Sequence, residues 1–143
     1  MIQARGIDAA AFARLHAATM ALDRPWTAVE FADLLAAPGA VALGDEDAAL
    51  LARVAAAEAE VLTLATHPAC RRQGHARRLL DQFAWVAAAR GATRAVLEVA
   101  EDNAPARALY EGAGYRLVGR RPAYYARGDR PPAAALVLAR VLP

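Results

Sequence analysis

The sequence predicts an α/β (α+β) domain built on a mixed sheet, and the order of its apolar segments is the main reason. Two amphipathic helical segments come first, and three short apolar runs separated by polar turns follow them. The second half alternates strand-like and helix-like segments, and the whole order is typical of a mixed sheet covered by helices. The 143 residues are enough for one domain, residues 1–143, and too few for two.

Two helices are expected at the N-terminal end. Asp8 is a good N-cap for a helix that runs to about Met20, and Thr27 is a good N-cap for a second helix. Pro38 and Gly39 end the second helix. The residues expected on the inward faces of the two helices are Phe12, Leu15, Thr19, Phe31, Leu34 and Leu35.

Three short strands are expected next, at residues 40–43, 49–54 and 59–66. Residues 44–47 form a polar turn between the first two, and residues 56–58 separate the second from the third. Such short, closely spaced runs favour an antiparallel meander.

The second half begins with a long helix at about residues 74–90, which Gly91 ends. Residues 94–99 form a strand, and Asn103 and Pro105 start a further helix, because asparagine caps well and proline is tolerated in a first turn. A strand at 115–118, a polar loop at 120–132 and a last strand at 135–141 complete the chain. The expected apolar stripe of the long helix is Ala76, Leu79, Leu80, Phe83, Val86 and Ala87.

The composition excludes several classes of function. The sequence has no serine, which excludes serine-nucleophile chemistry. His16, His67 and His75 show no ligand spacing and Cys70 has no cysteine partner, so no metal site is expected. The net charge of +2 is small and the 17 arginines are spread along the chain, so nucleic-acid binding is not favoured.

A cytoplasmic location is also expected. No window approaches the roughly 18 strongly apolar residues of a membrane span, so no membrane partner is predicted. Residues 1–5 lack the layout of a signal peptide, and a lone cysteine, Cys70, suits a reducing compartment.

The first informative segment joins a strand to the long helix through an arginine-rich loop with a single glycine, Gly74. Backbone N–H groups at a helix N-terminus are unpaired and partly positive, so they bind phosphate oxygens. Gly74 and the small Ala76 allow a bulky anion to come close to the backbone. The loop lacks the lysine of a nucleotide P-loop and the three glycines of a dinucleotide fingerprint. An ordinary strand-to-helix turn with a solvated basic face is the alternative.

The segment Arg71-Arg72-Gln73-Gly74-His75-Ala76 resembles the Q/R-x-x-G-x-G/A loop of the GNAT superfamily of acetyltransferases. The resemblance implies the GNAT fold, a mixed, mostly antiparallel sheet of six to seven strands flanked by about four helices. It also implies acetyl-CoA as cosubstrate and no metal, with the loop holding the pyrophosphate and the preceding strand holding the pantetheine arm. The cofactor-binding residues that it implies are Leu64, Ala65, Thr66, Arg71, Arg72, Gln73, Gly74, His75, Ala76, Arg77 and Asn103.

A second segment, residues 97–115, is similar to the LEV-x-x-x-N-x-x-A-x-x-LY-E-x-x-G-[FY] pattern of the RimI-type branch of that superfamily. Pro25-Trp26-Thr27 with Phe31, and Arg121-Pro122-Ala123-Tyr124-Tyr125, resemble the start and a late loop of the same branch. Those enzymes acetylate protein N-termini, in the archetype the N-terminal alanine of a small-subunit ribosomal protein. The resemblance therefore implies the same reaction here, by direct transfer in a ternary complex.

Acetylation of an amine needs a neutral nucleophile and a proton for the departing thiolate. Glu98 is the candidate base: strand alternation aims it opposite Leu97 and Val99, and a carboxylate there is either exposed or functional. Tyr110 lies 12 residues later, at the base-to-acid spacing of the RimI-type pattern, and a phenol can donate to a developing thiolate. A solvent-facing glutamate and a core tyrosine are the structural alternatives.

Several other residues have both a structural interpretation and one that the resemblance implies. Asn103 is expected to cap a helix, and in the family it binds the pantetheine arm; Tyr124 and Tyr125 would line the peptide groove or anchor a loop. Cys70 is interpreted as incidental because GNAT enzymes transfer the acetyl group directly. Acidic residues that could attract a basic peptide to the groove are Glu58, Glu60, Glu101 and Asp102.

The sequence departs from the family pattern before the last strand, where an acidic residue is often found and residues 132–134 are Pro-Ala-Ala. The substrate contact of that carboxylate is absent here. Two alternatives to peptide Nα-acetylation therefore stay open. One is acetylation of a small-molecule amine on the same scaffold, and the other is a non-enzymatic module that binds acyl-CoA or nucleic acid through the arginine loop.

Overall fold

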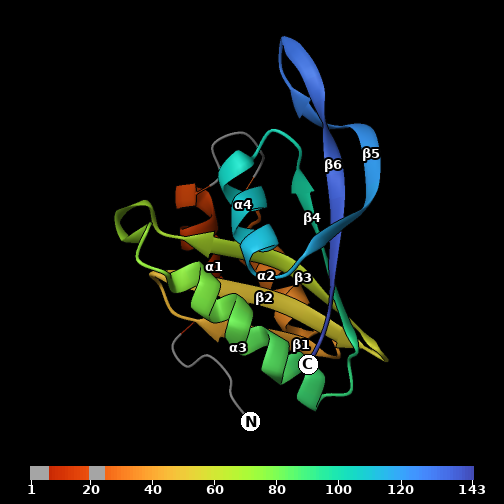
Figure 1. Cartoon of the computed structure of the whole chain (residues 1–143). Helices are drawn as coiled ribbons and strands as arrows, with labels where there is room; N and C mark the ends of the chain where they lie inside the picture. The colour runs from red at the N-terminus through yellow and green to blue at the C-terminus, as the bar shows by residue number, and fades with distance from the viewer. Residues whose placement is uncertain (1–6, 20–24) are drawn as a thin grey trace.

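A six-stranded sheet forms the framework of the computed structural model, which describes residues 7–19 and 25–143 (Figure 1). The strand order is β1-β2-β3-β4-β6-β5. Within the described residues β3 and β4 pair in parallel and every other neighbouring pair is antiparallel, so the predicted mixed sheet is confirmed. The strands are β1 (Ala40–Gly44), β2 (Ala48–Ala55), β3 (Glu58–Thr66), β4 (Arg94–Ala100), β5 (Arg116–Arg127) and β6 (Arg130–Val141).

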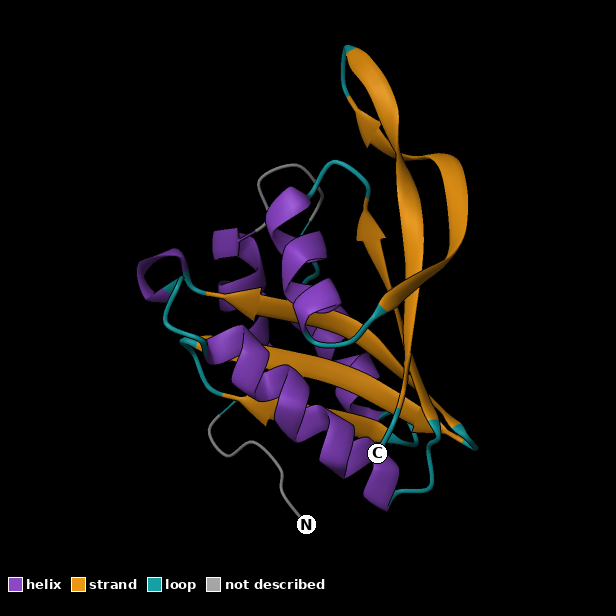
Figure 2. Cartoon of the chain, in the orientation of Figure 1, coloured by secondary structure: helices purple, strands orange, loops and turns teal. Residues whose placement is uncertain are grey.

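Helices cover both faces of the sheet (Figures 1 and 2). One face carries α1 (Ala9–Thr19) and α2 (Ala28–Ala36), and their buried residues form a cluster with Ala49, Leu51 and Ala65. The other face carries α3 (His75–Ala89) and α4 (Ala104–Gly112), which lie over the alternate residues of the same strands. A short 3-10 helix, η1 (Pro68–Cys70), precedes α3.

The predicted helix caps are confirmed, and they explain where the helices begin. The Asp8 carboxylate accepts a hydrogen bond from the Ala11 N–H at 2.9 Å. Thr27 and Glu30 form a reciprocal capping box at the start of α2, and Asn103 Oδ1 accepts from the Ala106 N–H at 3.2 Å at the start of α4. The expected end of the first helix at Met20 lies outside the described residues.

Most of the predicted inward residues form the core. Phe12, Leu15 and Phe31 are buried on the α1/α2 face. Phe83 of α3 is fully buried on the other face. The remaining members of the α3 stripe, Ala76 excepted, are buried with it. The exceptions are only half-buried: Thr19, Leu34, Leu35 and Ala76.

The prediction of a polar loop at residues 120–132 is wrong. Residues 116–127 and 130–141 form a long antiparallel hairpin that projects beyond the rest of the sheet (Figure 2). Pro122 is tolerated because β5 is the edge strand, and Ala123, with φ +56°, lies in an irregularity of the ladder between Arg121 and Tyr125. The prolines at 131 and 132 lie beyond the part of β6 that pairs with β4, so no ladder bond to β4 is lost.

The sheet opens between β3 and β4. Their parallel pairing covers three residue pairs and ends at Glu60 and Val96. Beyond that point β3 continues to Thr66 along β2, whereas β4 continues to Ala100 along β6. The two strands therefore diverge in the middle of the sheet (Figure 1).

Candidate functional site

The N-terminus of α3 has the geometry of an anion-binding helix start. Gly74 is the N-cap and adopts the left-handed conformation with φ +79°, and no side chain caps the helix. The first helical hydrogen bond runs from the Arg78 N–H to the Gly74 carbonyl at 3.1 Å. The N–H groups of residues 75–77 therefore have no intrahelical acceptor, as the anion-binding geometry requires.

Side chains around this turn hold its shape. The Arg78 guanidinium lies 3.1 Å from the Gln73 carbonyl oxygen, to which it donates, and 3.2 Å from His75 Nδ1. The side chains of Gln73 and His75 contact each other at 3.3 Å. Arg77 pairs with Asp81 at 3.2 Å on the exposed surface of the helix. Arg71 and Arg72 are exposed, and neither forms an ion pair with a described residue.

Arg78 is not among the predicted cofactor-binding residues, although its guanidinium bonds directly to the turn at the Gln73 carbonyl. Its position four residues after Gly74 places it above the turn on the same helix face, and that spacing is the signal that could have indicated it.

The predicted strand residues Leu64, Ala65 and Thr66 lie on the part of β3 that leaves β4. They pair with β2 through Leu50, Ala49 and Ala48 on one side. On the other side no described strand pairs with them, because the β3–β4 ladder has already ended. Backbone groups on that side are available to an extended ligand arm.

Glu98 and Tyr110 lie on opposite sides of the open sheet. The neighbours of Glu98 along β4, Leu97 and Val99, are buried in the α3/α4 cluster, so Glu98 points to the α1/α2 face, as alternation predicted. Tyr110 of α4 belongs to that α3/α4 cluster. A carboxylate and a phenol therefore flank the same sheet from its two faces.

The two groups differ strongly in their environment. The Glu98 side chain is 30% exposed and lies 3.3 Å from Arg121. Tyr110 is buried and packs edge-on against Tyr115, with ring centroids 6.0 Å apart. Burial raises the pKa of Tyr110 to about 12, so the phenol keeps its proton at neutral pH.

The Tyr110 hydroxyl is not fully enclosed by the described residues. It forms no hydrogen bond to another described residue. Because no fully buried polar side-chain atom of the described residues lacks a partner, this oxygen retains a small exposed area.

Two of the four acidic residues expected to attract a basic peptide are instead paired with arginines of the β5–β6 hairpin. Arg120 binds Glu101 through two contacts of 2.8 and 3.2 Å, which lowers the pKa of that carboxyl. Arg127 binds Asp102 through contacts of 2.8 and 3.1 Å and lowers its pKa in the same way.

Of the two remaining acidic residues, Glu60 lies 3.7 Å from Arg53. Glu58 is exposed at the start of β3.

Tyr124 and Tyr125 lie on β5 rather than in a loop. Their rings meet edge-to-face at 5.0 Å, and Tyr124 is exposed. Arg121 lies over the Tyr124 ring at 5.5 Å and Arg127 over the Tyr125 ring at 5.4 Å. The hairpin thus presents an aromatic and cationic surface beside Glu98.

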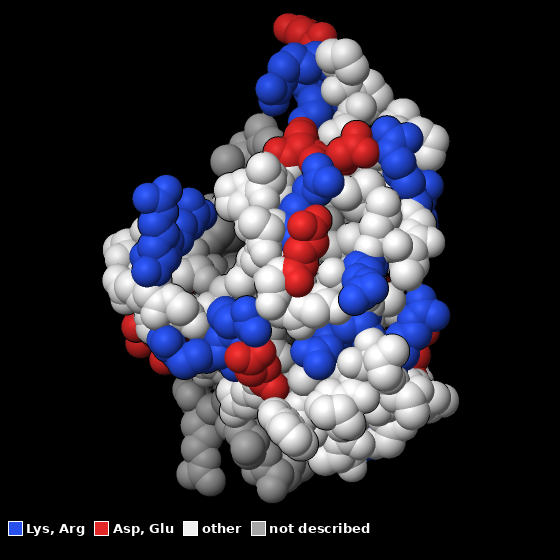
Figure 3. All heavy atoms as spheres, viewed as in Figure 1, with Lys and Arg blue, Asp and Glu red and all other residues white. Residues whose placement is uncertain are grey.

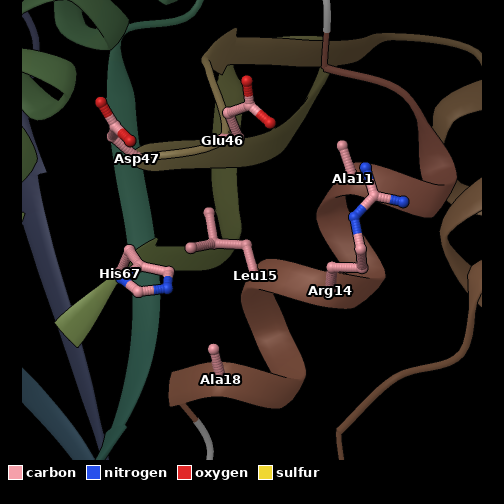
Figure 4. Close-up of a pocket in the computed structure, with 7 residues that line it drawn as sticks. All are labelled: Ala11, Arg14, Leu15, Ala18, Glu46, Asp47 and His67. Atoms are coloured by element: carbon pink, nitrogen blue, oxygen red, sulfur yellow. The ribbon is translucent and has the colours of Figure 1, made fainter. Parts of the chain in front are cut away.

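Two crevices lie away from the proposed reacting groups. One, of about 320 Å³, lies between α1 and the β1–β2 turn, and His67 lies in its wall (Figure 4). A second, of about 230 Å³, is lined by Asp45, His75 and Arg78 beside the start of α3.

Burial and the neighbouring Asp47 raise the pKa of the Cys70 thiol, which disfavours a nucleophilic thiolate.

Charge and metal-ligand chemistry give no second site. On the face shown in Figure 3 basic and acidic side chains are interspersed rather than gathered in one basic patch. In residues 7–19 and 25–143 no group of three or more His, Cys, Asp or Glu could hold a metal ion. None of the helices described is both long and apolar enough to cross a bilayer.

Comparisons with known proteins agree with this geometry. Residues 21–115 match the acetyltransferase (GNAT) family. The N-alpha-acetyltransferase RimI of Mycobacterium tuberculosis is 35% identical over 127 residues, which cover 82% of this chain and 78% of that protein. A ribosomal protein bS18 alanine N-acetyltransferase of Haemophilus ducreyi is 34% identical over 85 residues, 59% of the length of each protein.

A solved structure supports the same relationship. The crystal structure of a ribosomal-protein alanine N-acetyltransferase from Escherichia coli superposes with a TM-score of 0.83 at 27% identity, and the match covers 94% of this chain and 87% of that one. The predicted GNAT fold is therefore confirmed, and the described residues contain six strands and four α-helices.

Proposed function

Because the chain belongs to the GNAT family of acetyltransferases, we propose that it acetylates the N-terminal α-amino group of a protein with acetyl-CoA as the donor. The substrate class follows the RimI-type relatives, and we propose the N-terminal alanine of a small-subunit ribosomal protein. We further propose that residues 1–143 act as one domain in the cytoplasm. The observation that carries the proposal is the opening between β3 and β4, which has the α3 N-terminus and Tyr110 on one side and Glu98 on the other.

The residues at the opening fit acetyl-CoA. The uncapped N–H groups of residues 75–77, with the exposed Arg71 and Arg72, would hold the pyrophosphate. The unpaired edge of β3 at Leu64–Thr66 would hold the pantetheine arm by backbone hydrogen bonds. Acetyl-CoA supplies a thioester whose carbonyl carbon accepts the amine.

The side chains would move the two protons of the reaction. Glu98 would take the proton that the α-ammonium must lose, directly or through a water molecule, so that its nitrogen attacks the carbonyl carbon. Tyr110 would donate its hydroxyl proton to the sulfur as the carbon–sulfur bond breaks, and the second proton that the nitrogen loses on becoming an amide would return through solvent to the phenolate. The raised pKa of Tyr110 is compatible with this role, because the phenol is fully protonated before the reaction. The products are the N-acetylated protein and free CoA.

A thiol-release assay with acetyl-CoA tests the proposal. The acceptors to compare are a basic peptide with a free N-terminal alanine, the same peptide with a blocked N-terminus, and a polyamine. Turnover of the free peptide alone is expected. Turnover of the polyamine alone would support a small-molecule acetyltransferase instead, and a failure of acetyl-CoA to bind in calorimetry would exclude both enzymes.

Two variants test the assigned roles, and each has a matched control. Glu98→Gln and Tyr110→Phe are expected to lower kcat by about 100-fold or more while leaving the Kd for acetyl-CoA nearly unchanged. Glu60→Gln changes another exposed strand glutamate, and Tyr115→Phe changes another buried tyrosine in contact with Tyr110. Near-normal turnover in the first pair would refute the roles of base and acid.

A further inference from the structure

Three arginines of the β5–β6 hairpin pair with three carboxylates around the end of β4, and one pair differs from the other two. Arg120–Glu101 and Arg127–Asp102 each make two short contacts, and these pairs fasten the hairpin to the β4–α4 connection. The shortest contact between Arg121 and Glu98 is longer, at 3.3 Å from the guanidinium to Oε1. The structural fastening therefore does not depend on Arg121.

Arg121 is placed to act on Glu98. Its strand partner is Ala135, two residues from Val137, which pairs with Glu98, so the arginine reaches across β6 on the face to which Glu98 points. Its guanidinium also lies 5.5 Å from the centre of the exposed Tyr124 ring. The arginine thus joins the proposed base to the proposed acceptor surface.

We infer that Arg121 is a positioning residue for Glu98, which it orients for proton transfer while its charge favours the neutral form of the bound amine. This inference rests on the proposed function, because it assigns Arg121 a part in the same reaction. It concerns this ion pair, and not the coenzyme site.

The geometry gives Arg121 two effects. Its guanidinium lies 3.3 Å from Oε1 of Glu98, and this contact can fix the orientation of the carboxylate toward a bound amine. A fixed positive charge also disfavours a second positive charge nearby. In a largely solvated site, a fixed charge several ångströms away is expected to lower the pKa of the bound ammonium by roughly 0.5 to 1 unit.

The pH dependence of kcat for the free-alanine peptide tests the inference, because kcat reports ionisations in the enzyme–substrate complex. Arg121→Gln is expected to lower kcat about 10-fold and to move the acidic limb of the profile roughly 0.5 to 1 unit toward higher pH. Arg121→Lys keeps the charge and should restore the position of the limb but only part of kcat. The Kd for acetyl-CoA should stay near the wild-type value in both variants, which also shows that they fold.

A matched control and a double variant complete the experiment. Arg53→Gln removes an arginine from a comparably exposed cross-strand pair, Arg53–Glu60, and should leave the pH profile unchanged. In the Glu98→Gln background, Arg121→Gln should lower kcat little further, because the carboxylate that it orients is already lost, whereas the shift of the acidic limb should remain.

The inference would be overturned if Arg121→Gln left the pH profile unshifted, or if it lowered kcat equally in the wild-type and Glu98→Gln proteins. Either result would leave the proposed function intact. A wild-type protein that acetylates none of the acceptors would overturn both.

Discussion

The conformation of Gly74 provides the sharpest test of where the coenzyme binds. Substitution of Gly74 by alanine forces a side chain into the left-handed region at φ +79°. The new Cβ would lie 3.0 Å from Arg78 Nη1, which is the end of a flexible side chain and can shift. That shift would break the 3.1 Å bond from Arg78 to the Gln73 carbonyl and loosen the turn.

The two consequences can be estimated separately. The left-handed conformation costs an alanine about 1–2 kcal/mol, which lowers the melting temperature of a domain of this size by roughly 3–8 °C. A displaced turn would lose at least one charge-assisted hydrogen bond from residues 75–77 to the pyrophosphate. Such a bond is worth about 1.5–3 kcal/mol, so the Kd for CoA should rise at least roughly 10-fold.

Gly91 is a matched control at the other end of the same helix. It also has a positive φ, +94°, and an added Cβ there would meet nothing within 4 Å. Gly91→Ala should therefore lower the melting temperature by a similar amount and leave CoA binding unchanged. Calorimetric titration of CoA into both variants gives the comparison. If the two variants bind CoA equally tightly, the α3 N-terminus is not the pyrophosphate site.

Three further predictions concern stability. Burial raises the pKa of Tyr110 to about 12, so this tyrosine ionises first in the unfolded chain and folding stability should fall as pH rises from about 10 to 12. Urea denaturation at several pH values should show a smaller fall in Tyr110→Phe. Because Arg127 lowers the pKa of Asp102, the stabilising contribution of their pair should be complete above about pH 4 and lost in more acidic solution. Asp102→Asn should lower the melting temperature at neutral pH and flatten its acid dependence, as calorimetry can measure. Phe83→Ala, at a fully buried position, should cost about 3–5 kcal/mol in chemical denaturation.

The sequence was sufficient for the elements whose signals are local. Asp8, Thr27 and Asn103 mark helix starts because their side chains bond to the first turns that follow them. The orientation of Glu98 followed from alternation along one strand, which needs no tertiary information.

The hairpin could not be predicted because its signals are overridden by its place in the sheet. Pro122 and Gly128 are ordinary indicators of a loop. Only the edge position of β5 and the irregularity around Ala123 make a strand compatible with them. The pairs of Glu101 and Asp102 with arginines 19 and 25 residues away were hidden for the same reason.

The opening in the sheet has a physical cause that connects the fold to the proposed reaction. β4 is held along β6 through seven residue pairs, and the hairpin that contains β6 is fastened to the β4–α4 connection by Arg120 and Arg127. β3 stays paired with β2, away from β4. One β3 residue, Leu62, is unpaired at a bulge just after the point where the β3–β4 pairing ends.

Each strand thus has a stronger partner on its outer side, and neither can close the gap. A closed ladder would place hydrogen-bonded strands about 4.8 Å apart and would separate Glu98 from Tyr110 by a continuous sheet. Direct transfer from a thioester on the α4 side to an amine on the Glu98 side requires a gap at this position. In the proposed reaction, the arginine–carboxylate pairs of the hairpin would support the site by holding the β4–α4 connection to β5, on the side of the gap that lies away from β3.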